Sequence, residues 1–199
     1  MIGNDVVDFK QAQRESDWRR PGFLERVFTP SERLYIHHAQ DPDRMVWLLW
    51  SMKEACYKAH QRRMDLARSL NWQAQECFID SQNAEVVKGR VRIGKVWYQL
   101  HSQLNRNFVL SVATCDAGTE FRSVCDTRNP SRVKAVLLGW ITRIHKAGEG
   151  LHIEKNGHGV PSVFFKDEEV FNRFSFSGHG RFYALAFQPN DSLIRVKQS

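Results

Sequence analysis

Hydrophobic positions change their period along the chain, from a helical spacing in the first third to a strand-like alternation after residue 68. The longest helical pattern runs from Met45 to about Arg62, and a shorter helix starts at the capping box of residues 29–32 and ends near Ala39. Strands are predicted at residues 2–9, 76–80, 85–93, 95–101 and 108–114. Helices followed by an antiparallel meander indicate an α+β fold.

The rest of the chain repeats this order of elements. Residues 116–130 show little periodicity and are interpreted as a linker, after which Ser131 is expected to cap an amphipathic helix. Further strands are expected near residues 151–153, 162–165, 174–177 and 181–187. We therefore expect two similar halves, 1–115 and 131–199, related by a pseudo-twofold axis with a cleft between them, although any two β-hairpins would share part of this likeness.

Composition and charge narrow the class of protein. The 199 residues are 42% hydrophobic and 26% charged, which is typical of a globular chain. No apolar run approaches the roughly 20 residues of a membrane span, the N-terminus does not resemble a signal peptide, and the four cysteines do not suggest a disulfide framework. We expect a cytoplasmic protein with no membrane partner. The net charge of +7 favours an acidic partner, whether nucleic acid, acidic protein or polyphosphate.

The candidate chemistry lies in the longest helix, at residues 50–58, Trp-Ser-Met-Lys-Glu-Ala-Cys-Tyr-Lys. Glu54 and Lys58 are four residues apart and therefore share one face of the helix. Because much of this helix is apolar, its charged groups need partners, and a carboxylate beside an ammonium indicates a site for a metal and a phosphate. The alternative is an ordinary surface ion pair, worth less than about 1 kcal/mol.

Three motifs in order resemble the 4′-phosphopantetheinyl transferases, over about residues 1–114. Residues 2–5, Ile-Gly-Asn-Asp, resemble the family's apolar-Gly-x-Asp strand, and residues 50–58 resemble its aromatic-small-x-Lys-Glu-Ala-x-x-Lys helix. Residues 26–32 resemble the Arg-x-Phe-(Ser/Thr)-x-x-Glu helix start between them. Further on, residues 159–161 resemble the Gly-Lys-Pro loop and residues 174–182 the Ser-His-Ser-Gly turn. In two-half members this last part comes first, so the halves are expected in swapped order.

The resemblance implies transfer of 4′-phosphopantetheine from coenzyme A to a serine of an apo acyl or peptidyl carrier protein, as by a holo-acyl-carrier-protein synthase, with release of 3′,5′-ADP. It implies that Asp5 and Glu54 bind Mg²⁺, for which Mn²⁺ can substitute. It further implies that Glu54, directly or through a metal-bound water, is the base for the serine, and that Lys58 binds the diphosphate and stabilises charge on the leaving group. Further candidate coenzyme A ligands are Lys53, Ser177 and His179.

Departures from the family pattern keep alternatives open. Val160 stands where the family often has lysine, and Gly178 stands where it has histidine, which favours a relative that binds coenzyme A or a carrier protein without catalysis. Asp5 would otherwise bond a neighbouring turn, and His179 would be an ordinary turn histidine. A third hypothesis, a basic nucleic-acid-binding protein, lacks a recognisable motif, so no nucleic acid partner is expected. We expect a monomer whose carrier protein partner is acidic.

Overall fold

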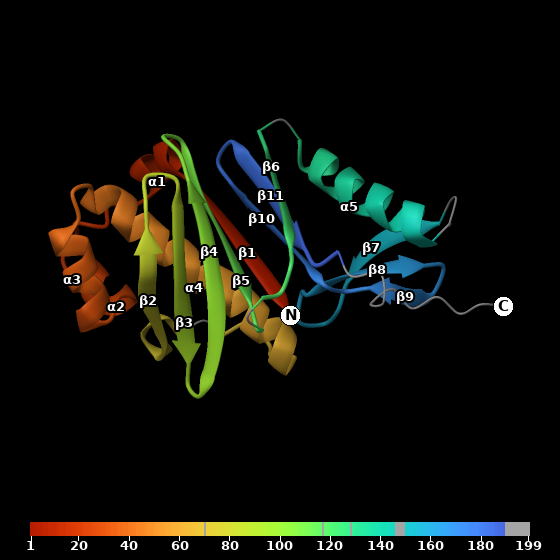
Figure 1. Ribbon diagram of the computed structural model, residues 1–199, viewed down its shortest axis with the longest axis horizontal. Helices are drawn as coiled ribbons and strands as arrows, with labels where there is room; N and C mark the ends of the chain where they lie inside the picture. Colours follow the sequence, from red (N-terminus) through yellow and green to blue (C-terminus); the bar gives the residue numbers. More distant parts are fainter. Residues whose placement is uncertain (70, 117, 128, 146–149, 190–199) are drawn as a thin grey trace.

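The structure has a first part, from β1 to β5, and a second part, from β6 to β11. The first strand, β1 (Ile2–Asp8), lies where these two parts meet (Figure 1). The computed structural model describes residues 1–199 apart from 70, 117, 128, 146–149 and 190–199. An antiparallel sheet has the strand order β1-β5-β4-β3-β2. Its other strands are β2 (Gln75–Gln82), β3 (Val86–Ile93), β4 (Val96–Leu104) and β5 (Phe108–Thr114).

Helix α4 (Pro42–Met64) packs across one face of this sheet, against β1 and β5 most of all. Apolar side chains of α4 meet those of the strands in the main core, which includes Leu49, Met52, Val91 and Tyr98. The capping box of the preceding helix is confirmed. The shorter helices are α1 (Phe9–Glu15), α2 (Phe23–Val27), α3 (Pro30–His38) and the 3-10 helix η1 (Trp72–Ala74).

The second part of the chain holds one helix and two small antiparallel sheets. Helix α5 (Pro130–His145) buries its apolar side against Phe174, Leu185 and Phe187. One sheet has the order β10-β11-β6 and the other the order β7-β8-β9. The strands are β6 (Arg122–Asp126), β7 (Leu151–Lys155), β8 (Pro161–Phe165), β9 (Glu168–Phe171), β10 (Phe174–His179) and β11 (Phe182–Phe187).

The two parts are joined by apolar contacts between sheets. Val6 of β1 and Leu110 of β5 form a buried cluster with Phe182 and Ala184 of β11. Ile2, Val112 and Ala186 form a second such cluster beside it. β10 and β11 therefore lie against the side of β1 that faces away from α4.

The α+β fold with antiparallel sheets is confirmed, whereas the pseudo-twofold likeness and the division into halves stay predictions. The interpretation of 116–130 as a linker is wrong for Arg122–Asp126, which form β6 and pair with β11. Ser131 is not the cap of α5, because its amide donates to Oδ1 of Asn129 at 2.8 Å. Asn129 is thus the capping residue, and Pro130 takes the first helical position. Among the described helices, none is long and apolar enough to cross a membrane.

Candidate active site

Strand β1 crosses α4 at very short range, and a glycine permits this approach. A Cβ atom on Gly3 would collide with the carbonyl oxygen of Ala55 and lie 2.5 Å from the amide nitrogen of Ala59. Glycine is therefore required at the second position of the Ile-Gly-Asn-Asp motif. Because side chains alternate along a strand, Asp5 shares the face of Gly3 and points toward α4. The motif places a carboxylate against the helix.

A narrow stripe of α4 remains partly exposed beside this carboxylate. Between residues 45 and 59 every residue is buried except Trp50, Glu54 and Lys58. These three are spaced by four, so they follow one another along one side of the helix. Trp72 covers Trp50, with ring centroids 4.2 Å apart. Glu54 and Lys58 are therefore the polar part of the stripe, on the shared face that the sequence predicts.

Lys58 is held in place by two oxygens of β1. Its Nζ lies 3.0 Å from Oδ1 of Asp5 and donates to the carbonyl oxygen of Asn4 at 2.9 Å. The side chains of Lys58 and Asp5 are 29% and 14% exposed, so the ion pair is shielded yet open to solvent on one side. Ser51 donates its hydroxyl to the Asp5 carbonyl oxygen at 3.0 Å. These bonds fix the ammonium before any ligand binds.

Glu54 and Asp5 both have raised pKa values. Burial raises the pKa of Glu54 to about 7, the charge of Asp5 adds to this effect, and Lys58 and Arg68 oppose it. Burial also raises the pKa of Asp5, against the attraction of Lys58. Burial destabilises the charged form of both carboxylates, and the charge of Asp5 adds to this at Glu54. A hard divalent cation would stabilise that charged form.

The donor set fits a magnesium ion that shares its coordination with substrate. In the described ranges, no group of three or more histidine, cysteine, aspartate or glutamate side chains is placed to hold a metal. Mg²⁺ is usually bound through one or two carboxylates and keeps waters or phosphate oxygens as its other ligands. Asp5 and Glu54 supply two such carboxylates. Their role as metal ligands stays a prediction.

A cleft of about 330 Å³ opens beside the stripe. Glu54, Lys58 and Arg62 line it from α4, and residues 159–161 with Ser175 line it from the second part of the chain. Further cationic side chains in its lining are Arg68 and Lys155. A carboxylate among several cations suits a phosphate-bearing ligand. A larger groove of about 790 Å³ between α3 and the β2–β3 turn contains none of the predicted site residues. The smaller cleft is therefore the better candidate for the active site.

Ser177 and His179 hold β10 against β1, and neither lines this cleft. The Oγ atoms of Ser175 and Ser177 accept hydrogen bonds from the backbone N–H and the side-chain amide of Asn4, at 3.1 and 3.0 Å. His179 accepts the Asp8 amide on Nδ1 at 2.9 Å, and its Nε2 lies 3.1 Å from Glu15. Side chains at alternate positions thus bind the free edge of β1. Coenzyme A binding by Ser177 and His179 stays a prediction.

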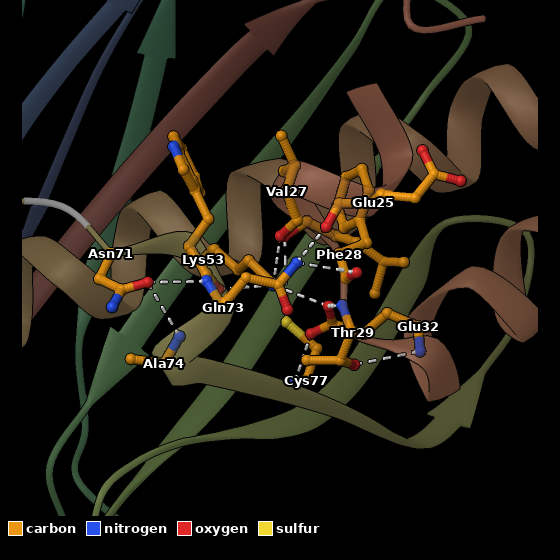
Figure 2. A network of polar contacts seen from close by, with 12 residues as sticks. Glu25, Val27, Phe28, Thr29, Glu32, Lys53, Asn71, Gln73, Ala74 and Cys77 are labelled. Atoms are coloured by element: carbon orange, nitrogen blue, oxygen red, sulfur yellow. Dashed lines mark hydrogen bonds and ion pairs between the residues drawn. The ribbon is translucent and has the colours of Figure 1, made fainter. Parts of the chain in front are cut away.

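The structure does not bring Lys53 to the cleft, which corrects its candidacy as a coenzyme A ligand. Figure 2 shows Lys53 within a network of polar contacts that includes Val27, Thr29 and Glu32. Its Nζ lies 2.7 Å from Oε2 of Glu32. It also donates to the carbonyl oxygens of Val27 and Trp72, at 2.8 and 2.9 Å. The side chain of Lys53 has no exposed surface. Adjacent positions on a helix point about 100° apart, so Lys53 faces away from the cleft that Glu54 lines. Lys53 is a structural residue.

Comparison with models of protein families matches residues 1–113 to the 4′-phosphopantetheinyl transferase superfamily. The chain belongs to this superfamily. A search among curated proteins finds no match. The superfamily match runs from β1 to β5 and includes Asp5, Glu54 and Lys58. As phosphopantetheinyl transferases, such proteins use coenzyme A and act on carrier proteins, generally with a divalent metal.

The sequence did not reveal the remaining residues that line the candidate cleft. Arg62 lies four positions after Lys58, so the helical spacing alone would have placed it on the same stripe. Arg68 and Ser175 carry no comparable signal, because their place in the cleft depends on how distant segments pack. The wall formed by residues 159–161 lies outside the matched range.

Proposed function

We propose that this protein transfers 4′-phosphopantetheine from coenzyme A to a serine of an apo acyl or peptidyl carrier protein in a Mg²⁺-dependent reaction that releases 3′,5′-ADP. Superfamily membership supports the reaction class. The observation that carries the proposal is the cleft itself, where Glu54 and a fixed Lys58 lie beside Asp5 and further cations surround them.

Asp5 and Glu54 are the residues that would hold the metal. When bound, Mg²⁺ would screen the diphosphate of coenzyme A and stabilise negative charge on the leaving oxygen. Mn²⁺ prefers the same oxygen donors and should support the reaction.

Lys58 is suited to bind the diphosphate. An ammonium has three N–H groups, and in the described structure two of them face Asp5 and the Asn4 carbonyl oxygen. The third is available to a phosphate oxygen at the open side of the pair. Because both protein contacts hold the side chain in place, little rotamer freedom remains to be lost on binding.

Glu54 is suited to accept the proton of the carrier serine. Burial raises its pKa to about 7 in the metal-free protein, and a bound cation would keep the carboxylate ionised at neutral pH and able to accept a proton. In the proposed reaction the serine oxygen bonds to the β-phosphorus, the bond from that phosphorus to the oxygen of 3′,5′-ADP breaks, and the serine proton moves to Glu54.

The charge distribution supports an acidic carrier protein. The chain carries a net charge of +7. Five arginines lie within its first 33 residues, namely Arg14, Arg19, Arg20, Arg26 and Arg33. Arg19 and Arg33 pair with Asp43 and Glu25, whereas Arg14, Arg20 and Arg26 are exposed. Such exposed cations attract an acidic surface over a distance of about 10 Å at ordinary ionic strength. Both walls of the cleft come from one chain, which supports a monomeric enzyme.

A protein that binds coenzyme A or a carrier protein without transfer is the second candidate. Val160 lines the cleft and supplies no charge where the family pattern often has lysine. The missing charge favours weaker phosphate binding, as the second candidate would have. The second candidate, however, gives no reason for the presence of Asp5, Glu54 and Lys58.

Intact-mass spectrometry of apo carrier proteins tests the proposal. Each carrier is incubated with the protein, coenzyme A and Mg²⁺, and a parallel reaction contains EDTA. We expect a gain of one phosphopantetheine group that EDTA abolishes. Coenzyme A binding without a mass gain on any of several acyl and peptidyl carriers would instead establish the second candidate.

A further inference from the structure

Two adjacent side chains near the end of α4 reach across the cleft to its opposite wall. Nη1 of Arg62 donates to the carbonyl oxygens of Pro161 and Asn172, at 3.0 and 2.6 Å. Nε2 of Gln61 donates to the carbonyl oxygen of His158 at 3.1 Å. These bonds join the helix that carries Glu54 to segments 97 to 110 residues later in the chain.

The surroundings of Arg62 show that this contact is built into the fold. Its guanidinium carbon lies 5.5 Å from the ring centroid of Phe174, so the cation covers an aromatic face. Burial lowers the pKa of Arg62 to about 10, which still leaves the group charged at neutral pH. A charged group in such a place needs its hydrogen bonds, because removing them leaves it poorly solvated.

The segment that these side chains hold is a tight turn with bonds of its own. The Asn156 amide donates to the Val160 carbonyl oxygen at 3.0 Å, and the Gly159 amide donates to the Asn156 carbonyl oxygen at 2.9 Å. Gly159 has a φ of 77°, a value that glycine adopts without strain. The turn is therefore fixed internally. Its position relative to α4 rests on the bond of Gln61 to His158, on the contact of His158 Nδ1 with Asp65 at 3.1 Å, and on the bond of Arg62 to Pro161 directly after the turn.

Arg62 continues the stripe that carries the proposed chemistry. Glu54, Lys58 and Arg62 are spaced by four and all line the cleft, whose opposite wall includes the turn. A shift of the turn would change the width of the cleft at Lys58. Contacts that fix such a wall in the free protein reduce the cost of ordering it when a ligand binds.

We propose that Arg62 and Gln61 are positioning residues that hold the turn of residues 156–160, through His158 and through Pro161 directly after it, against α4 and thereby set the width of the coenzyme A cleft. The identity of the ligand rests on the proposed function, whereas the contact with the turn does not.

Hydrogen exchange in the free protein, paired with coenzyme A binding, tests this role. Arg62→Gln should speed exchange of the amides in 156–160 by about tenfold or more, since hydrogen bonds to a charged group are lost. It should also raise the Kd for coenzyme A by about tenfold. Exchange at Val87 and Val91 in the main core, which reports global opening, should not change.

Arg63→Gln is the matched control, because it removes the same charge from the next residue, which is exposed. It should leave both readouts within about twofold. Arg62→Lys retains a cation with fewer donors and should give intermediate exchange and binding. It also serves if Arg62→Gln does not fold.

Two results would overturn the proposal. Unchanged exchange at 156–160 with weaker coenzyme A binding would make Arg62 a direct ligand contact. Faster exchange everywhere would make it a residue of general stability. If exchange rises locally while no carrier is modified by the wild-type protein, the positioning role stands and the proposed function fails.

Discussion

Neighbouring residues of α4, Lys53 and Glu54, lie in opposite settings. Lys53 is enclosed by Glu32 and two carbonyl oxygens and has no exposed surface. Glu54 lines the cleft, and burial raises its pKa to about 7 because Lys58 and Arg68 only partly offset the cost. One residue is therefore suited to structure and the other to chemistry. The difference arises because adjacent helix positions point about 100° apart, so that only Glu54 faces the cleft.

Metal affinity should depend on pH near neutrality. A proton and a metal compete for Glu54, so below its pKa of about 7 the Kd for Mg²⁺ should rise, approaching tenfold per pH unit. Above pH 8 the Kd should level off. Titration calorimetry from pH 5.5 to 8.5 measures this. A flat profile would contradict the raised pKa, and Glu54→Gln should remove most of the dependence.

Removing one charge of the buried Lys53–Glu32 pair should lower the free energy of unfolding more than removing both charges. Lys53→Met leaves the Glu32 carboxylate buried without its cation and should lower the free energy of unfolding by about 3–5 kcal/mol. The double variant Lys53→Met, Glu32→Gln removes both charges, keeps a side-chain oxygen for the buried amides that Glu32 binds, and should lose less than the single variant. Urea denaturation measures both. A double variant less stable than the single one would show that the charges themselves stabilise the fold.

At the scale of elements, the close crossing of β1 and α4 creates the site. Gly3 lets the strand touch the helix, and Asp5 and Lys58 meet as a result. Nζ of Lys58 also donates a hydrogen bond to the carbonyl oxygen of Asn4 in the strand. Strand and helix are thus positioned by the same residues that form the proposed site.

Gly3→Ala should therefore damage both stability and activity. The added methyl group collides with backbone atoms of Ala55 and Ala59, which cannot rotate away. Overpacking of this kind costs about 1–3 kcal/mol. We expect a lower melting temperature and a fall in kcat, because the separation of Asp5 from Lys58 increases. Gly139→Ala in α5, where an added Cβ meets nothing within 4 Å, is the control for activity. Full activity in Gly3→Ala would show that the close crossing is dispensable.

Local signals predicted the elements, and tertiary contacts decided the rest. Thr29 and Glu32 were predicted as a capping box, and both bonds form. The second role of Glu32, as partner of Lys53, could not be predicted because Lys53 lies 21 residues away and only packing brings it near. Strand β6 was missed for the same reason, since its few apolar residues become a strand by pairing with β11. Motifs in the sequence mark Asp5, Glu54 and Lys58, and their roles in the site stay predictions.

At the scale of the whole molecule, the two parts are held together near both ends of β10. Near its start, Arg62 binds the carbonyl oxygen of Asn172. Just beyond its end, Arg181 binds both carboxylate oxygens of Asp8, at 2.8 and 2.7 Å. Between them, Ser175 satisfies an amide of the β1 edge. The proposed cleft thus lies between parts joined mainly by side chains rather than by a shared backbone ladder.

The Asp8–Arg181 pair should make the free energy of unfolding depend on pH in the acidic range. Hydrogen bonds from Arg181 hold the pKa of Asp8 well below its usual range. The pair therefore stabilises the fold fully above the unfolded carboxyl's pKa of about 4, and this contribution is lost as pH falls below that value. Asp8→Asn should cost about 2 kcal/mol at pH 7 and progressively less at pH 3. Urea denaturation at both pH values measures the difference, and an equal cost at both would contradict the pair's role.

The central claim is that phosphopantetheine transfer takes place where α4 meets β1. The most direct test compares initial rates of carrier modification, measured by intact mass, for wild type, Glu54→Gln and Glu76→Gln. Glu76 is a matched control, because it lies in β2 outside the cleft and pairs with Arg92. We predict that Glu54→Gln lowers kcat by about 100-fold or more with its fold intact, as expected for loss of a residue proposed both to bind the metal and to act as general base, and that Glu76→Gln stays within about twofold. A Glu54→Gln protein that modifies its carrier at the wild-type rate would contradict the account.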